Sequence, residues 1–139
     1  MNVVVDTNVL VAGLLSPFGA CGEIVRMLSS GELTISFDAR IISEYEEVLR
    51  REKFGFEEEK IVAFLDYMIS QGCAVAPSPL FESLSDPDDE PFLEVALASQ
   101  SLGIVTGNQK HFPHERCRGV KIFSPTVFLV FFKEQKELW

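Results

Sequence analysis

The sequence predicts an α/β protein, a three-layer α/β/α sandwich whose mostly parallel central sheet has helices on both faces. Two observations carry this prediction. Short apolar segments rich in valine, isoleucine and phenylalanine alternate with longer segments of helical periodicity, which is typical of βαβ units. Polar residues directly follow two of the apolar segments, where the carboxyl ends of parallel strands bind ligands in such folds. The length of 139 residues suits one domain, 1–139.

The first half of the chain contains two predicted strands and two predicted helices. Residues 2–5 (NVVV) and 33–37 (LTISF) are apolar enough to be buried strands. Apolar residues then recur at helical spacing over 41–49, and Asp38 is placed to cap this helix. A second amphipathic helix is predicted over 61–69.

The second half continues the alternation. Pro91 suits the first turn of a helix that we expect to run to about Leu102. Strands are predicted over 103–106 (GIVT) and 120–123 (VKIF). The last helix, TVFLVFF followed by Trp139, is more apolar than one core-facing stripe requires, so it is either deeply buried or a face for self-association.

Composition bounds the class of protein. Hydrophobic residues make up 47% of the chain, but no apolar run reaches the roughly 18 residues of a membrane span. The N-terminus has no basic region or cleavage site of a signal peptide, and the three scattered cysteines do not suggest a disulfide framework. We therefore expect a cytoplasmic protein without a membrane partner.

The net charge of −9 disfavours a general nucleic-acid binder, but the charge is unevenly distributed. Residues 78–103 contain six acids and no Lys or Arg. Residues 104–124 have a local balance of +3. Such clusters are usually solvated faces, so a function for them requires further support.

Acidic and polar side chains gather at the predicted carboxyl edge of the sheet. Asp6 follows the first strand, Thr106 and Asn108 follow the strand GIVT, and DPDDEP (86–91) precedes the helix that leads into it. Helix capping by Asp6 or Thr7, and by the acids of 86–91, is the simpler interpretation. Several converging carboxylates would nevertheless repel one another without a cation, and oxygen ligands suit Mg²⁺ or Mn²⁺.

The chain resembles the PIN-domain family, and among its members the VapC-like toxins. The resemblance covers nearly the whole chain, and its segments occur in the family's order. These segments are VVVDTNVLVAGL (3–14), SEYEEVLRR (43–51), DPDDEPFLEVALAS (86–99), IVTGNQKHF (104–112) and FSPTVFL (123–129).

The resemblance implies a metal site. The family's metal-binding acids match Asp6, Glu44 and Asp89, whereas its fourth acid is replaced by Asn108. An amide oxygen can hold a metal-bound water but contributes no charge. The resemblance therefore implies a second metal ion and full activity less strongly than it implies the first metal ion. Helical periodicity does not choose between Glu44 and Glu46; the resemblance selects Glu44. Thr106 is expected to orient a ligand or a phosphate.

The implied activity is phosphodiester hydrolysis of RNA by a Mg²⁺- or Mn²⁺-dependent endoribonuclease, as the toxin of a toxin–antitoxin pair. The implied partners are RNA, an antitoxin protein and a second copy in a homodimer or higher homo-oligomer. Basic residues would hold the RNA backbone at the rim of the acidic site. The candidates are Lys110, Arg116, Arg118, Lys121, Arg50 and Arg51.

Three alternatives compete with this interpretation. Asn108 leaves open a non-catalytic PIN fold that binds RNA or protein. A receiver-like phosphoacceptor domain is a second alternative, with Asp38 at the end of the second strand as the acceptor. His111, His114 and Cys117 have loose zinc-like spacing, but Pro113 interrupts them and no fourth ligand is nearby, which disfavours a zinc site.

Overall fold

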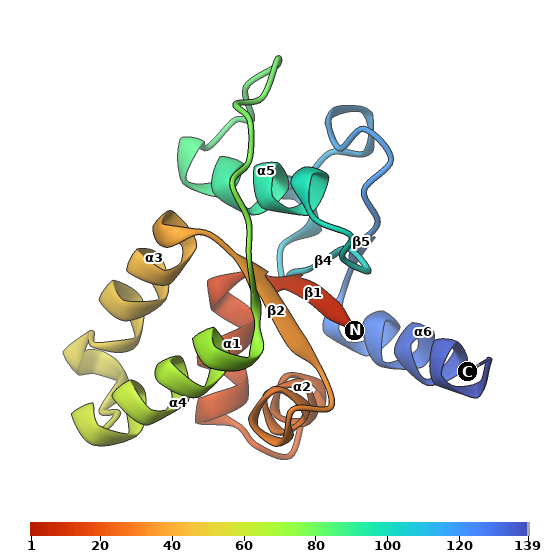
Figure 1. Ribbon diagram of the computed structural model, residues 1–139. Coiled ribbons are helices and arrows are strands. Elements are labelled where there is room, and N and C mark those ends of the chain that lie inside the picture. The colour runs from red at the N-terminus through yellow and green to blue at the C-terminus, as the bar shows by residue number, and fades with distance from the viewer. Residues whose placement is uncertain (139) are drawn as a thin grey trace.

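The computed structural model describes residues 1–138 and has a five-stranded, all-parallel sheet at its centre (Figure 1). The strand order is β3-β2-β1-β4-β5. The strands are β1 (Asn2–Val5), β2 (Thr34–Phe37), β3 (Cys73–Ala74), β4 (Ile104–Val105) and β5 (Ile122–Phe123). The order reverses direction at β1, so its carboxyl end is the position at which parallel α/β sheets bind ligands.

Six α-helices surround this sheet and confirm the predicted fold class. Figure 1 shows α5 on one side of the sheet and α1, α2 and α4 on the other. The helices are α1 (Thr7–Leu15), α2 (Ala20–Ser30), α3 (Ala39–Leu49), α4 (Glu58–Gln71), α5 (Glu90–Ala98) and α6 (Pro125–Glu137).

Strand β1 is the central strand and pairs with a neighbour on each side. Val3 lies opposite Ile35 of β2, and Val5 lies opposite Val105 of β4. All of these residues are buried, and they belong to one cluster of buried apolar side chains. The run of valines is therefore explained by burial on both faces of a parallel sheet.

Side-chain caps form at the start of two helices, and the one at Asp38 was predicted. The Asp38 side chain accepts a hydrogen bond from the backbone N–H of Ile41, at 3.1 Å, and starts α3. The Ser124 hydroxyl accepts one from the N–H of Val127, at 3.3 Å, and starts α6.

One predicted boundary was wrong, and one strand was missed. The helix expected to reach Leu102 ends at Ala98, because Ser99 is extended and caps the helix. Three more residues follow before Gly103, whose φ of 145° turns the chain into β4. The missed strand is β3, which has only two residues, both exposed.

Helix α6 is neither fully buried nor fully exposed. Phe128, Leu129 and Phe132 pack into the core, whereas Val127 and Val130 are each 57% exposed. The expectation of a deeply buried helix was therefore wrong for one face. Trp139, which was part of the predicted association face, lies outside the described residues.

No single helix within residues 1–138 has the length and apolar character needed to cross a membrane. Helices α1 and α2 reach that length only together, and they are bent by 99° relative to each other.

Candidate active site

The carboxyl ends of β1 and β4 bring together Asp6 and Thr106, as the sequence predicted. The Thr106 hydroxyl donates a hydrogen bond of 2.7 Å to Oδ2 of Asp6, and both side chains are buried. The same hydroxyl accepts a hydrogen bond from the backbone N–H of Asn108, at 3.0 Å. Thr106 therefore fixes the orientation of the Asp6 carboxylate and links it to the next loop.

Asp6 occupies the N-cap position of α1, but its side chain makes no capping hydrogen bond to that helix. It turns toward β4 instead. Simple capping by Asp6, the plainer interpretation of the sequence, does not explain why a carboxylate is buried here.

Glu44 lies on α3 and is half-buried, with Oε2 accepting a hydrogen bond from the hydroxyl of Thr7. Glu46 is exposed and lies 3.8 Å from Arg50, so it points away from the sheet edge. The adjacent Tyr45 is buried and donates a hydrogen bond to the backbone carbonyl of Val5. This bond holds α3 against the end of β1 and presents Glu44 toward the start of α1.

Asp89 reaches the cluster from a short 3-10 helix, Pro87–Asp89, directly before α5. Its Oδ2 atom lies 3.0 Å from Nδ1 of His111, an ion-pair distance. The contact with His111 does not have hydrogen-bond geometry, and within residues 1–138 no other group donates a hydrogen bond to this buried oxygen. It therefore retains lone pairs that an additional group could use.

His111 belongs to the site but was considered from the sequence only as a zinc ligand. It lies between Asp89 and Asn108, whose side-chain Nδ2 is 2.8 Å from the histidine Nε2. The signal that could have identified it is its position three residues after Asn108, within one 3-10 turn. The other two residues of the zinc motif differ in environment: His114 is exposed and Cys117 is buried.

Burial raises the pKa values of all three carboxyl groups, and repulsion by other carboxylates adds to this effect in Glu44 and Asp89. Desolvation raises the pKa of Asp6, although hydrogen bonds from Thr106 and the backbone N–H of Thr7 oppose it. Desolvation also raises the pKa of Glu44, and the charge of Asp6 adds to this effect.

Among these three carboxyl groups, Asp89 has the most strongly raised pKa. Burial raises its pKa to about 6, His111 opposes this increase, and Asp6, Asp86 and Glu44 add to it. The three acids from β1, α3 and the segment before α5 therefore lie within electrostatic reach of one another. Such a cluster is costly when it is fully ionised, and a cation would relieve the cost.

The donor set fits a hard divalent cation in its chemistry. Carboxylate and amide oxygens are the ligands that Mg²⁺ and Mn²⁺ prefer, and Oδ2 of Asp89 has an unused acceptor position. Within residues 1–138, however, no three His, Cys, Asp or Glu side chains are grouped closely enough to hold a metal ion as they stand. Thr7 holds Glu44 and His111 holds Asp89, so closing the cluster requires side-chain rotation.

The predicted basic rim is only partly available, and the prediction was wrong for Arg118 and Lys121, which lie before β5 at the opposite end of the sheet. Arg50 forms ion pairs with Glu58 and Glu46, and Arg51 forms one with Glu47. Arg116 is tied to the Ser83 carbonyl, at 2.9 Å, and to Glu82, at 3.3 Å. Lys110 is exposed in the same 3-10 turn as His111.

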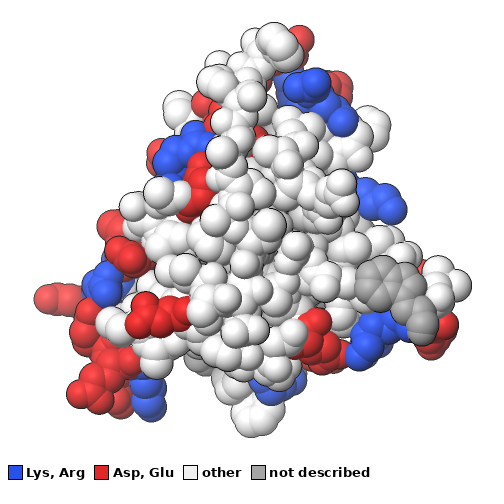
Figure 2. All heavy atoms as spheres, viewed as in Figure 1, with Lys and Arg blue, Asp and Glu red and all other residues white. Residues whose placement is uncertain are grey.

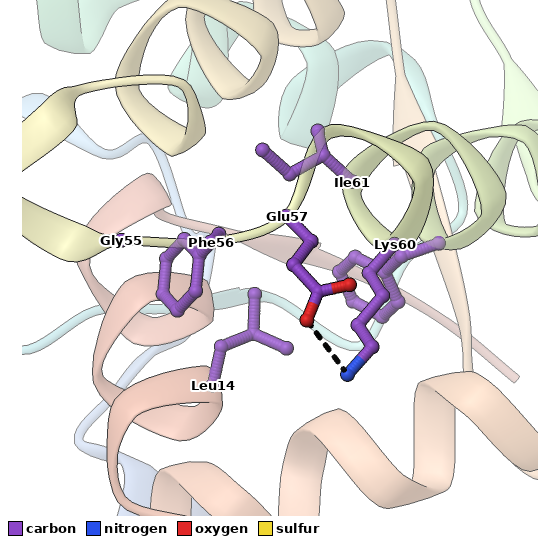
Figure 3. A pocket seen from close by; sticks show the side chains of 7 residues that line it. Leu14, Gly55, Phe56, Glu57, Lys60 and Ile61 are labelled. Carbon is purple, nitrogen blue, oxygen red and sulfur yellow. Dashed lines mark ion pairs between the residues drawn. The ribbon is translucent and has the colours of Figure 1, made fainter.

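A separate, apolar hollow lies away from the carboxylates. It has a volume of about 260 Å³ and is formed by the last part of α1, the segment before α4 and the first turns of α4. Figure 3 shows Leu14, Phe56 and Ile61 around it, with an ion pair between Glu57 and Lys60 at its side. These residues include no cluster of acids, so the hollow is distinct from the candidate active site.

Comparison with known proteins agrees with this arrangement. Residues 2–110 match the PIN domain family, and this segment contains all four predicted metal-site residues. An uncharacterized protein of Methanocaldococcus jannaschii is 28% identical over 114 residues, which cover 78% of this chain and 72% of the relative. No solved structure matches the chain significantly. With the parallel sheet and the acids at its carboxyl edge, the family match shows that this chain belongs to the PIN domain family, whose members are generally metal-dependent nucleases.

Proposed function

We propose that this protein is a Mg²⁺- or Mn²⁺-dependent endoribonuclease that hydrolyses phosphodiester bonds in RNA. The observation that carries the proposal is the convergence of Asp6, Glu44 and Asp89 from three separate elements. Beyond the effect of burial, the charge of Asp6 raises the pKa of Glu44 and of Asp89, and the charge of Glu44 raises that of Asp89. Bringing three acids together in a partly buried position destabilises a fold, and such arrangements are typical of functional sites.

The three carboxylates would hold the cation, with the Asn108 amide as a neutral member of the same shell. When bound, the cation would stabilise the negative charge on the phosphate oxygens and would lower the pKa of a water molecule. The remaining residues position these ligands. Thr106 orients Asp6, Thr7 orients Glu44, and His111 holds the Asp89 side chain at the edge of the cluster.

The test is RNA cleavage by the parent protein and by Asp6→Asn, with Mn²⁺ and with EDTA. Loss of outer-shell partners typically costs 10- to 100-fold, so we expect loss of this ligand to reduce cleavage by at least about 100-fold. The fold should survive, because burial already disfavours the charge of Asp6. Asp66→Asn, on the exposed surface of α4, is the matched control. Cleavage by Asp6→Asn at the parental rate would disprove the proposal.

A toxin role is a finer part of the same proposal. It predicts that induced expression arrests growth, that Asp6→Asn abolishes the arrest, and that a small antitoxin protein encoded nearby suppresses it. If the purified protein cleaves RNA but its expression leaves growth unaffected, the protein is a nuclease without a toxin role. Homo-oligomerisation stays a prediction that light scattering can test.

A non-catalytic PIN fold is the second candidate function, and one observation favours it. The Asn108 side chain contacts His111, where the family's fourth acid would contribute charge. RNA binding by the parent protein without Mn²⁺-dependent cleavage would favour this second function.

A further inference from the structure

A second concave surface lies at the opposite edge of the sheet from the candidate active site. The cavity has a volume of about 490 Å³ and lies between the end of α5, the loop before β5 and α6. Gly103 precedes β4 and Lys121 precedes β5, whereas Asp6 and Thr106 follow their strands. Because the strands are parallel, the cavity and the carboxylates occupy opposite ends of the sheet. The polar and aromatic lining includes Ser101, Arg118, Lys121, Phe131 and Gln135.

The charged residues that line this cavity are all cations. Arg118 and Lys121 line it, and no Asp or Glu does. Four other cavities in the described part of the chain each include at least one carboxylate, and Arg118, together with Phe81, also lines two of them. An all-cationic lining is notable in a protein with 21 acids and 12 bases.

Neither cation is neutralised by a carboxylate among residues 1–138. The Arg118 guanidinium lies over the ring of Phe81, at 5.5 Å from its centroid. The Lys121 ammonium lies over the ring of Phe131, at 4.7 Å. These contacts orient the cations but leave their charge uncompensated.

Two further features point to a ligand. Arg118 has a φ of 50°, and it is the one non-glycine residue with a positive φ in the described part of the chain. Such a conformation costs free energy in a bulky residue and is often kept for function. The hydroxyl of Ser101, a residue of the same lining, has no hydrogen-bond partner within the described residues; it is buried, so a phosphate can accept its hydrogen bond only after the side chain turns into the cavity.

We infer that this cavity binds a phosphate group through Arg118, Lys121 and Ser101. A phosphate accepts several hydrogen bonds at once, which matches a guanidinium fork, an ammonium and a hydroxyl. The group can come from the terminal phosphate of a nucleotide or from an internal phosphodiester of RNA. Because the cavity is at the other edge of the sheet, this inference does not depend on the nuclease activity.

The experiment measures ligand binding by calorimetry in low salt with EDTA, which removes divalent cations from the carboxylates. The probes are 5′-AMP, adenosine, and an RNA trinucleotide with hydroxyl groups at both ends. We expect 5′-AMP to bind and adenosine to bind at least about tenfold more weakly. Binding of the trinucleotide identifies an internal phosphodiester as sufficient, and failure of the trinucleotide alone identifies a terminal phosphate.

Matched variants distinguish this cavity from general attraction of anions. Arg118→Gln with Lys121→Gln should weaken phosphate binding at least about tenfold. Arg26→Gln with Lys53→Gln removes the same charge elsewhere and should not. The double variant Arg118→Lys with Lys121→Arg keeps both charges and is the control for a folding defect caused by substitution at these positions. It should bind the phosphate probe within a few-fold of the parent. The inference is overturned if no phosphate probe binds, or if the Gln pair binds like the parent. Mn²⁺-dependent cleavage by the same proteins is scored separately, so failure here leaves the nuclease proposal intact.

Discussion

Asn108 is the residue at which the sequence departs from the family's acidic pattern. The side-chain amide of Asn108 contacts the His111 ring, and its backbone N–H donates a hydrogen bond to the Thr106 hydroxyl. Asn108 therefore lies within the cluster although it carries no charge. This position makes Asn108 the most informative single residue for testing whether the cluster binds a cation.

We predict that Asn108→Asp increases the thermal stabilisation by Mn²⁺ by several degrees compared with the parent. The added carboxylate gives the cation a charge-assisted contact, whereas in EDTA it repels Asp6 and Asp89 and should lower the melting temperature. Asn108→Ala is the control, because it removes the amide without adding charge. Equal melting temperatures of parent and Asn108→Asp under both conditions would place this residue outside any cation site.

The pKa of Asp89 predicts how stability depends on pH without a metal. In the folded protein Asp89 keeps its proton up to about pH 6, whereas an unfolded aspartate loses it near about pH 4. The unfolded state therefore releases this proton first, and the free energy of unfolding should fall as pH rises from about 4 to about 6, by of order 2 kcal/mol.

Urea unfolding in EDTA across this pH range measures the effect. Asp89→Asn should show a flatter dependence and should be more stable than the parent near pH 7. Mn²⁺ should stabilise the parent more at pH 7 than at pH 5, because ligands must lose their protons to bind a metal. Identical pH profiles for parent and Asp89→Asn would contradict this account.

At the scale of elements, the start of α3 shows that an aspartate after a strand can be purely structural. Asp38 caps α3 and lies 2.7 Å from Arg40, which also contacts Glu94 of α5 at 2.7 Å. This pairing connects two helices and occupies the carboxylate that the receiver-like alternative would use as phosphoacceptor.

We predict that Asp38→Ala lowers the free energy of unfolding by about 1 kcal/mol, the usual value of an N-cap. RNA cleavage should stay within about twofold of the parent. Asp38→Asn retains a capping oxygen but loses the charge that pairs with Arg40, so it should recover only part of the loss. Transfer of phosphate from acetyl phosphate to Asp38 would contradict the capping role and revive the receiver-like alternative.

The predictability of most elements followed their burial pattern. Strands β1, β2, β4 and β5 were predicted because they are short apolar runs. Helix α1 was not assigned a range, because Val9, Leu10 and Val11 are all buried and the helix shows no apolar stripe. Helix α2 was missed although its buried residues follow helical spacing. Strand β3 has only two residues, and both are exposed.

The candidate site was predictable only in part, for a related reason. The strand ends located Asp6 and Thr106, since the edge of a parallel sheet follows from the order of elements. Periodicity left Glu44 and Glu46 equivalent, and the packing of Tyr45 against Val5 separates them. The placement of His111 beside Asp89 depends on how two loops fold toward each other, which no local pattern encodes.

At the scale of the whole molecule, acidic side chains are in excess but mixed with basic ones. Figure 2 shows many acidic side chains on the side of α3 and α4, with basic side chains among them, and both kinds near α6. With a net charge of −9, the protein repels RNA at long range, so binding must rely on few local cations.

We predict that Lys110→Ala weakens RNA binding several-fold and lowers the slope of log affinity against log salt by about 0.7, the value for one contact to a single strand. Lys60→Ala, whose cation pairs with Glu57, is the control and should change neither quantity. Fluorescence anisotropy in EDTA over a salt series measures both without cleavage. An unchanged slope in Lys110→Ala would remove this residue from the RNA path.

The hydrogen bond between Thr106 and Asp6 joins residues 100 positions apart and has a consequence for synthesis of the protein. Strand β4, which completes the pairing of β1, is made only after the long stretch of chain that separates it from Asp6. Long-range parallel pairing also closes slowly. The nascent chain therefore carries Asp6 long before it can assemble the candidate site, so any metal-dependent activity of that site can arise only after β4 has been made and has paired with β1.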